Sequence, residues 1–467
     1  MAIGSPKTDF AARVADLLGD IHPPLRPEVE LEIDNVCKEV SDLCASVLTQ
    51  LSSDFQPPPD LRRIGAWKLG VAQPGTELDL LLVAPDAALP GLVEGLRKAS
   101  SSSIRTAASD GLLNGPGVKF KQRGTSVKLL FAASSHLAPA PVPVPTHAAR
   151  CGESVSNRIL EQVPDRARFC ELLALVRYWA QQRGVFGSLF GFFSGTAWAI
   201  CCGCICQMHP GATTAELLSS FFQDLCYWDW SAPIALSTES LEPGKFQGRG
   251  DGQLVVKLPI GEGLSATPNM CEFALRAIQK ELKRSVKLLG EMDSGEADLT
   301  ELFAQHNFFQ RYRHYIQFDF LTKEEEIMDE WLSWGQTQIQ ELLQHCESTN
   351  DNKVTLRPWP CLVDFKDGDW PHARAIFIGI HRQRMEGEDA ATKQIIDFRE
   401  IMVKFLVKIS AWPEAEHYQN QLELLIRPVS QDHLKDWLRH QQAGLVVPVP
   451  PREENDDIVP LDGEEVS

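Results

Sequence analysis

The stretch that decides the fold of this chain reads Ile64-Gly-Ala-Trp-Lys-Leu-Gly-Val-Ala-Gln-Pro-Gly-Thr-Glu-Leu-Asp-Leu-Leu-Leu-Val-Ala-Pro85. Its first half is interrupted by glycines, which favour turns, and its second half has the spacing of a β-strand over residues 78–83. Glu77 and Asp79 stand where that strand begins. The stretch therefore predicts a turn followed by a strand that carries two carboxylates at its start.

Length and charge set the class of the protein. The chain has 467 residues, a hydrophobic fraction of 43% and a net charge of -18. This length and apolar content predict two or three globular domains with real cores. An acidic chain is poorly suited to holding long RNA along its backbone, although a local basic site remains compatible with it, since fields follow local arrangement.

The chain shows no signal for export or for a membrane. Its first residues lack a secretory pattern, and no span approaches about 20 uninterrupted apolar residues. No clear nuclear signal is visible either, so we expect a cytoplasmic protein with reduced thiols. The cluster Cys201, Cys202, Cys204 and Cys206 lacks paired Cys-x-x-Cys spacing and lies in an apolar run. We therefore expect buried helix thiols and no zinc site.

Patterns along the chain divide it into sections. Helical spacing over 10–51 is followed by strand spacing over 78–83 and 117–132, and the proline-rich run 138–145 predicts an extended connector. Helical patterns resume from residue 157, continue through 169–183 and 194–208, and return over 270–289. A third section predicts strands at 315–320 and 375–380 and helices at 323–346 and 392–406. The acidic tail, 452–467, predicts disorder.

Five blocks of the chain resemble eukaryotic poly(A) polymerases, in the order in which that family carries them. The blocks are 64–85; Gly117-Val-Lys-Phe-Lys-Gln-Arg-Gly-Thr-Ser-Val-Lys128 with 129–132; 169–198, containing Gly191-Phe-Phe-Ser-Gly-Thr-Ala-Trp198; Leu258-Pro-Ile260 with Asn269 beyond; and Leu302-Phe-Ala-Gln-His-Asn-Phe-Phe-Gln-Arg-Tyr-Arg-His-Tyr-Ile316. The resemblance spans about residues 62–437. Long ordered blocks are more specific than a single short motif.

The resemblance implies an α+β fold with a three-part architecture. Its parts are a polymerase-β-type nucleotidyltransferase domain with a mixed sheet and helices, a helical central domain, and a ferredoxin-like domain similar to an RNA-recognition module. On this sequence they correspond to N-terminal helices packing on the central domain (1–55), the nucleotidyltransferase-like domain (56–150), the central domain (151–305), the RNA-recognition-like domain (306–445) and an acidic disordered tail (446–467).

The resemblance also locates the family's metal-binding positions. Family members use three aspartates there to hold two magnesium ions for phosphoryl transfer. In this chain the three positions are Glu77, Asp79 and Lys128. An ammonium group offers no acceptor and repels a cation, so we expect Lys128 to pair with Asp79 and Glu77 and no metal to bind. Mg²⁺ and ATP are implied only if polymerase activity survives.

The residues that the resemblance assigns to the nucleotide are altered as well. Ala66 replaces the serine of the family's Gly-Ser turn, Gln181 replaces a lysine and Phe186 a tyrosine, while Arg177 keeps the charge of a phosphate-binding lysine. The full set implied to bind a nucleotide or RNA end is Gly65, Ala66, Lys68, Arg177, Gln181, Phe186, Gly195, Thr196 and Asn269. Arg311, Arg313 and His314 are candidates for RNA contact. Lys119, Lys121 and Arg123 alternate along one strand and form either a basic stripe or a solvated edge.

Three functions remain open on the sequence. The first is a protein that binds an RNA 3′ end, tRNA being one candidate, after losing two-metal nucleotidyl transfer. The second is a transferase that uses an aminoacyl-tRNA ester, which needs positioning and a general base but no metal. Fungal arginine-containing cyclodipeptide synthases use charged tRNA in this way, and no motif assigns the chain to them. The third is an active poly(A) polymerase with an unusual metal site.

Overall fold

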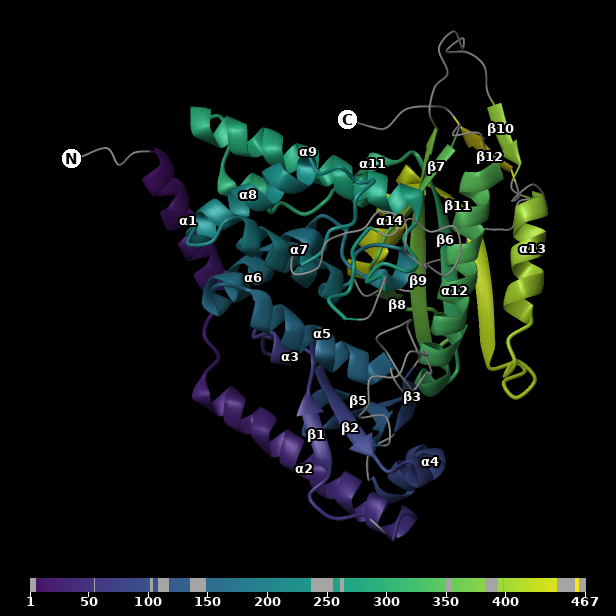
Figure 1. Ribbon diagram of the computed structural model, residues 1–467. Helices are drawn as coiled ribbons and strands as arrows, with labels where there is room; N and C mark the ends of the chain where they lie inside the picture. Colours follow the sequence, from purple (N-terminus) through teal and green to yellow (C-terminus); the bar gives the residue numbers. More distant parts are fainter. Residues whose placement is uncertain are drawn as a thin grey trace. The chain divides into compact units, whose positions relative to one another are not determined.

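A computed structural model describes residues 6–53, 55–100, 104–107, 117–134, 148–236, 255–260, 264–349, 354–382, 394–397, 399–442 and 458–461 (Figure 1). The chain divides into two units. The first comprises Met1–Gln181, Phe193–Pro268 and Gln279–Ala304, and the second comprises Gln182–Phe192, Asn269–Ile278 and Gln305–Ser467. No helix of the described residues is both long and apolar enough to cross a membrane. The expected connector at 138–145 lies outside these residues.

The first unit contains the mixed sheet that the sequence predicts. Its strands are β1 (Asp60–Arg63), β2 (Leu78–Ala84), β3 (Arg105–Ala107), β4 (Gly117–Gln122) and β5 (Thr125–Ala133). They lie in the order β1-β2-β5-β4-β3. The β2–β5 pair is parallel, and every other neighbouring pair is antiparallel. The parallel pair at the centre brings the start of β2 beside the start of β5.

The two faces of this sheet differ in character. Alternate side chains of β2, β4 and β5 form one apolar core with α2 (Pro27–Leu51) and α4 (Leu89–Ala99), because strand residues alternate between faces. The opposite face carries a small cluster of Ile64, Leu81, Leu130 and Ala132. Asp79 and Lys128 alternate with the residues of the large core and so belong to this second face.

The N-terminal helices differ from the expected arrangement. We predicted that both would pack on the helical central part. Helix α1 (Pro6–Ile21) does contact α8, and Arg13 pairs with Asp298 at 2.9 Å. Helix α2 instead buries Val36, Val40 and Cys44 against the sheet and α4. Its amphipathic stripe fits either partner, so local spacing does not specify which one it takes.

Helices make up the rest of the first unit. They are α3 (Gly65–Lys68), α5 (Ala148–Gln162), α6 (Arg166–Gln182, up to Gln181), α7 (Gly195–Met208), α8 (Thr214–Cys226), the later part of α9 (Glu272–Ser294) and α10 (Leu299–Leu302). Their centre is aromatic: Trp179 contacts Trp198 and Phe222, and its Nε1 donates to Ser285 Oγ at 3.1 Å. The four clustered cysteines are buried inside α7 as free thiols, as predicted.

The second unit contains the predicted C-terminal α/β domain. Its elements follow the order β6 (His314–Thr322), α12 (Glu325–Thr349), β7 (Val354–Pro358), β9 (His372–Arg382), α13 (Arg399–Ser410) and β11 (Leu422–Ser430). The antiparallel strand order β11-β6-β9-β7 is that of a ferredoxin-like βαββαβ fold. A short strand, β8 (Val363–Phe365), also pairs with β9.

Helices cover both faces of this second sheet. Helices α12 and α13 lie side by side on one face, where Phe318 meets Phe405 and Phe320 meets Trp331 (Figure 1). On the other face α11 (Phe308–Arg311) and α14 (Gln431–Gln442) contribute to a core of Phe308, Tyr312, Tyr315, Trp359, Ala375, Phe377, Val429, Leu434 and Trp437. The face opposite α12 and α13 is therefore covered by a largely aromatic core that belongs to the same unit.

Two boundaries differ from the predicted domains. The second unit also takes in Gln182–Phe192 and Asn269–Ile278, which we had placed in the helical central domain. Gly191 lies so close to Asn269 that a Cβ atom there would stand 2.5 Å from its carbonyl oxygen. In the tail predicted to be disordered, residues 458–461 form β12 (Ile458–Leu461), which pairs with β10 (Gln394–Asp397). Acidic composition alone predicted disorder for these four residues, because it does not show which strand they can pair with.

Candidate functional site

The candidate site lies on the first sheet, where three neighbouring strands present charged side chains side by side. Asp79 of β2 stands opposite Lys128 of β5, and Lys128 stands opposite Lys119 of β4. Residues directly opposite each other on adjacent strands have their side chains on the same face. Lys128 is 8% exposed, so most of its side chain is buried. The register thus fixes one carboxylate and two ammonium groups in a row.

Burial controls the acidity of Asp79. Burial, and next the negative charge of Glu77, raise the pKa of Asp79 to about 6, while Lys128, Lys119 and Arg177 oppose this rise. Burial lowers the pKa of Arg177 on α6, and the charge of Asp79 works against that change. A carboxyl group with a pKa near neutrality can exchange a proton at physiological pH.

The partner of Glu77 differs from the expected one. We predicted that Lys128 would pair with both Glu77 and Asp79. In the described part of the chain Glu77 Oε1 instead lies 3.2 Å from Lys119 Nζ, and Lys128 forms no ion pair within 4.0 Å. Lys128 acts on Asp79 through its charge alone. The predicted basic stripe is also divided, because Arg123 lies in the turn after β4 and pairs with Glu39 of α2 at 3.0 Å.

A tight turn holds the backbone against Asp79. Gly65 has a φ of 61°, and a Cβ atom at this position would stand 2.8 Å from Asp79 Oδ2. The Ile64 amide donates to the Asp79 carbonyl at 3.0 Å, and Cys170 Sγ of α6 donates to the Leu69 carbonyl at 3.1 Å. Ala66 and Lys68 follow in α3, next to this glycine. Only glycine combines this positive φ with so close an approach.

The residues present do not fit a two-magnesium centre. Such a centre needs several oxygen ligands converging on hard cations. Here one carboxylate is paired with Lys119, the other has a pKa raised to about 6, and the third position is an ammonium group. Among the described residues no group of three His, Cys, Asp or Glu side chains could hold a metal ion. The charge of Lys128 disfavours a divalent cation beside Asp79.

Some of the other candidate residues belong to the same unit as Asp79. Arg177 is near enough for its charge to act on Asp79, and Gln181 is exposed one helical turn further along α6. Gly195 and Thr196 form the first turn of α7, where the Ser194 side chain accepts from the Ala197 amide. The structure therefore supports a charged group formed by Asp79 and Arg177, with the α7 turn as a separate feature of the same unit.

The remaining candidates belong to the second unit. Phe186 and Asn269 lie in the two segments that join the C-terminal domain, and the Asn269 carbonyl accepts from Gln340 Nε2 at 3.0 Å. Arg311 ends α11, Arg313 is exposed, and His314 begins β6. None of these five belongs to the unit that carries Asp79.

Sequence reasoning missed His22, which lies in the loop after α1. Its Nδ1 is hydrogen-bonded to the Gln73 side-chain amide. Burial lowers the pKa of His22, and the charge of Arg177 lowers it further, while a backbone hydrogen bond to Gly70 raises it. His22 therefore stands within the electrostatic reach of Arg177. No local pattern points to it, because the contact joins segments about fifty residues apart in the chain.

The chain is similar in sequence to known poly(A) polymerases. Residues 168–305 match the model of the poly(A) polymerase central domain. Poly(A) polymerase pla1 of Schizosaccharomyces pombe is 28% identical over 313 residues, which cover 61% of this chain and 54% of that protein. Nuclear poly(A) polymerase 4 of Arabidopsis thaliana is 25% identical over 374 residues, which cover 74% of this chain and 50% of that protein. This chain spans about half the length of these curated relatives.

A solved structure of a cytoplasmic RNA terminal U-transferase aligns with 64% of this chain and 99% of its own, at 14% identity and a TM-score of 0.47. By sequence the chain is similar to poly(A) polymerases, and its units combine sheets and helices in a mixed α+β fold.

Proposed function

We propose that this protein holds the 3′ end of an RNA on a poly(A) polymerase fold and does not perform two-metal nucleotidyl transfer. The observation that carries the proposal is the register of β2 and β5, which sets the Lys128 ammonium opposite Asp79. Arg177 and Lys119 add two further positive charges around that carboxylate. Positive charges attract phosphate oxygens, which carboxylates alone would repel. The net charge of -18 suits a short contact better than a long track of phosphates.

Loss of transfer is tested by primer extension. The purified protein is incubated with a 5′-labelled oligoadenylate, ATP and either Mg²⁺ or Mn²⁺, with an active poly(A) polymerase as the positive control. We expect no added nucleotides. Extension that disappears in Asp79→Asn would show that Asp79 still serves nucleotidyl transfer, and the proposal would be wrong.

End recognition is tested by binding. One RNA sequence is prepared in linear and in circularised form, so that composition and charge are matched and only the end differs. We expect the linear form to bind at least about tenfold more tightly, or about 1.4 kcal/mol. Equal affinity for both forms contradicts recognition of an end. Lys128→Met, which keeps the length of the side chain and removes its charge, is expected to reduce this preference.

Acids placed at positions 77 and 128 test whether Lys128 keeps a metal ion out of the site. Lys128→Asp combined with Glu77→Asp restores three acids at the family's metal positions. We expect this variant to bind Mn²⁺ at least about tenfold more tightly than the wild type in calorimetry, since a repelling charge becomes a ligand. Lys121→Asp, at an exposed position of β4 two residues from Lys119, is the matched control for charge. If both variants bind alike, Lys128 does not determine metal exclusion.

A second function is favoured by one specific observation, the pKa of about 6 of Asp79. A carboxylate near neutrality suits a general base, and acyl transfer from an aminoacyl-tRNA ester needs such a base but no metal ion. Incubation with a pool of charged tRNAs, followed by mass spectrometry, tests it. We expect a released amide or dipeptide product that Asp79→Asn abolishes. No product from any charged tRNA rules this function out and leaves the binding function standing.

A further inference from the structure

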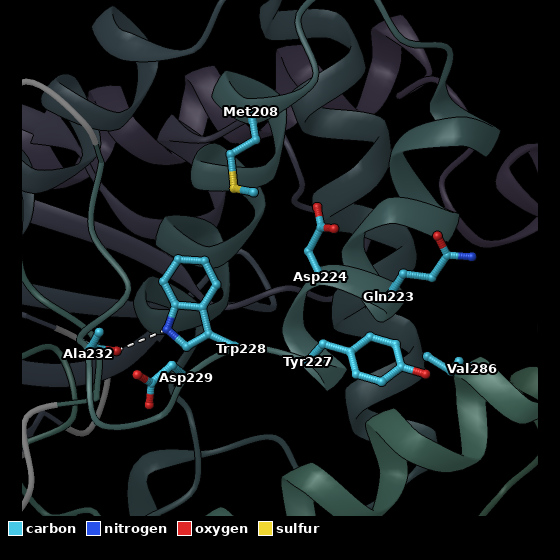
Figure 2. A pocket seen from close by; sticks show the side chains of 8 residues that line it. All are labelled: Met208, Gln223, Asp224, Tyr227, Trp228, Asp229, Ala232 and Val286. Carbon is cyan, nitrogen blue, oxygen red and sulfur yellow. Dashed lines mark hydrogen bonds between the residues drawn. The ribbon is translucent and has the colours of Figure 1, made fainter.

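A pocket of about 700 Å³ lies in the helical part of the first unit, apart from the residues of the candidate site. Met208 at the end of α7, Gln223 and Asp224 of α8, Tyr227, Trp228, Asp229 and Ala232 of the following loop, and Val286 of α9 line it (Figure 2). This lining combines two aromatic rings, two carboxylates and short apolar surfaces, and it contains no basic side chain. We propose that the pocket binds a lysine- or arginine-containing segment of a partner protein.

The aromatic rings are the first part of the argument. Tyr227 is 79% exposed, so its ring is accessible to a ligand. Trp228 is fixed, because its Nε1 donates to the Ala232 carbonyl at 2.9 Å, a bond that Figure 2 shows. An ordered ring binds a cation over its face at little entropic cost. Tyr227 and Trp228 therefore supply the surface on which an ammonium or guanidinium group stacks.

The carboxylates are the second part. Asp229 accepts from both the amide and the hydroxyl of Ser231, and the side-chain bond, followed by the backbone bond, lowers its pKa. Asp229 is therefore an anion at neutral pH. Asp224 Oδ2 lies 2.7 Å from His209 Nε2, which fixes its orientation at the pocket. On α9 the nearby Lys287 is paired with Glu291 at 3.3 Å. The two carboxylates repel the phosphates of RNA and attract a basic group.

The size and the apolar lining specify a peptide segment. A volume of about 700 Å³ falls in the range of known ligand-binding pockets. Met208, which is 49% exposed, and Val286 offer apolar contact to the alkyl stems of lysine or arginine while their charged ends reach the carboxylates. Two separated carboxylates fit two basic side chains of one extended segment better than a single small cation.

Fluorescence anisotropy on the full chain tests the proposal at about 0.15 M salt, where remote charges are screened. The probe is a labelled eight-residue peptide of alternating arginine and glycine, and a peptide with glutamate for arginine is the negative control. We expect Tyr227→Ala and Asp229→Asn each to weaken binding about five- to tenfold, and Tyr227→Phe, which keeps the ring, to retain it. Tyr227 is exposed, so the substitution leaves the core intact, and unchanged thermal unfolding verifies this.

The matched control addresses the acidity of the whole chain. Glu30→Gln removes one exposed charge from α2, and we expect it to change peptide affinity less than twofold. If Tyr227→Ala and Asp229→Asn weaken binding no more than Glu30→Gln, the peptide follows the net charge and the proposal is wrong. It is also wrong if spermidine displaces the peptide at equal concentration, or if Tyr227→Ala weakens oligoadenylate binding and leaves peptide binding unchanged.

Discussion

Asp79 and Asp319 offer a direct comparison between the two units. Each lies in a sheet strand with neighbours on both sides, Asp79 in β2 and Asp319 in β6, and burial raises the pKa of each to about 6. Their surroundings differ. Asp319 is fully buried and accepts a hydrogen bond from Gln317 Nε2 at 2.7 Å. Its Oδ2 lies 3.2 Å from Nη2 of Arg427. Asp79 is partly exposed beside a second acid, and cations act on it from three elements.

The difference separates two buried carboxyl groups by the charges that surround them. A raised pKa alone marks both residues equally, since burial is the largest cause in each. The second cause distinguishes them: a like charge raises the pKa of Asp79 further, whereas for Asp319 the opposite charge of Arg427 comes next and lowers it. Partial exposure and repulsion from Glu77, more than a raised pKa, therefore distinguish Asp79 from Asp319.

The largest expected effect is a pH dependence that both residues share. For each, the pKa rises from 3.8 in the unfolded chain to about 6 in the folded one, so the folded state binds the proton more tightly. The resulting stability is fully present below pH 3.8 and is lost as the pH rises through 6. We expect Asp319→Asn to reduce the change in the free energy of unfolding over this pH range by at most about 3 kcal/mol. Urea unfolding between pH 4 and 7 measures it, and an unchanged slope contradicts the assignment.

Removal of the whole side chain separates the two residues at pH 7. Asp319→Ala leaves the buried Gln317 amide without its acceptor and opens a space between strands, so we expect a loss of about 2 kcal/mol in the free energy of unfolding. Asp79→Ala relieves burial and repulsion from Glu77, so we expect a change within about 1 kcal/mol. Equal losses in the two variants, measured by urea unfolding, would remove the distinction.

The turn at Gly65 tests the geometry around Asp79. Gly65→Ala adds a Cβ atom 2.8 Å from Asp79 Oδ2 in a backbone with a φ of 61°, so we expect a stability loss of about 1–2 kcal/mol and a weakened preference for linear RNA. Gly75→Ala is the matched control, because Gly75 also has a positive φ of 87° but no atom within 4 Å. It should cost stability alone. Equal RNA binding by both variants would exclude a role for the turn.

The smallest expected effect compares the two lysines beside Asp79. Lys119→Met breaks a largely exposed pair with Glu77, so we expect less than about 1 kcal/mol change in stability. Lys128 opposes the raised pKa of Asp79 more than Lys119 does, so Lys128→Met should raise that pKa further than Lys119→Met. Carboxyl carbon chemical shifts followed across pH 4–8 measure it. The reverse order would show that Lys119 is the closer charge in solution.

Much of the fold was predictable because its signals are local. Alternation predicted β2, β4, β5, β6 and β9, and apolar spacing predicted α7 with its buried cysteines. Strands β7 and β11 were not predicted, and the helix predicted over 392–406 begins only at Arg399, because residues 394–397 form β10. The packing partner of α2 and the assignment of residues 182–192 and 269–278 to the second unit were not predictable. These depend on contacts between distant segments, and a local pattern states that a face is apolar without stating what covers it.

The sequence by itself determined that Lys128, an ammonium group and not an acid, stands at a position that the resemblance assigns to metal binding, because the chemical identity of a side chain does not depend on the fold. Only the tertiary structure decided that Glu77 pairs with Lys119, that Lys128 acts on Asp79 through its charge alone, and that Asp79 has a pKa near 6. Ion pairs and pKa values depend on distance and burial, and both arise only when β2, β4, β5 and α6 are packed together.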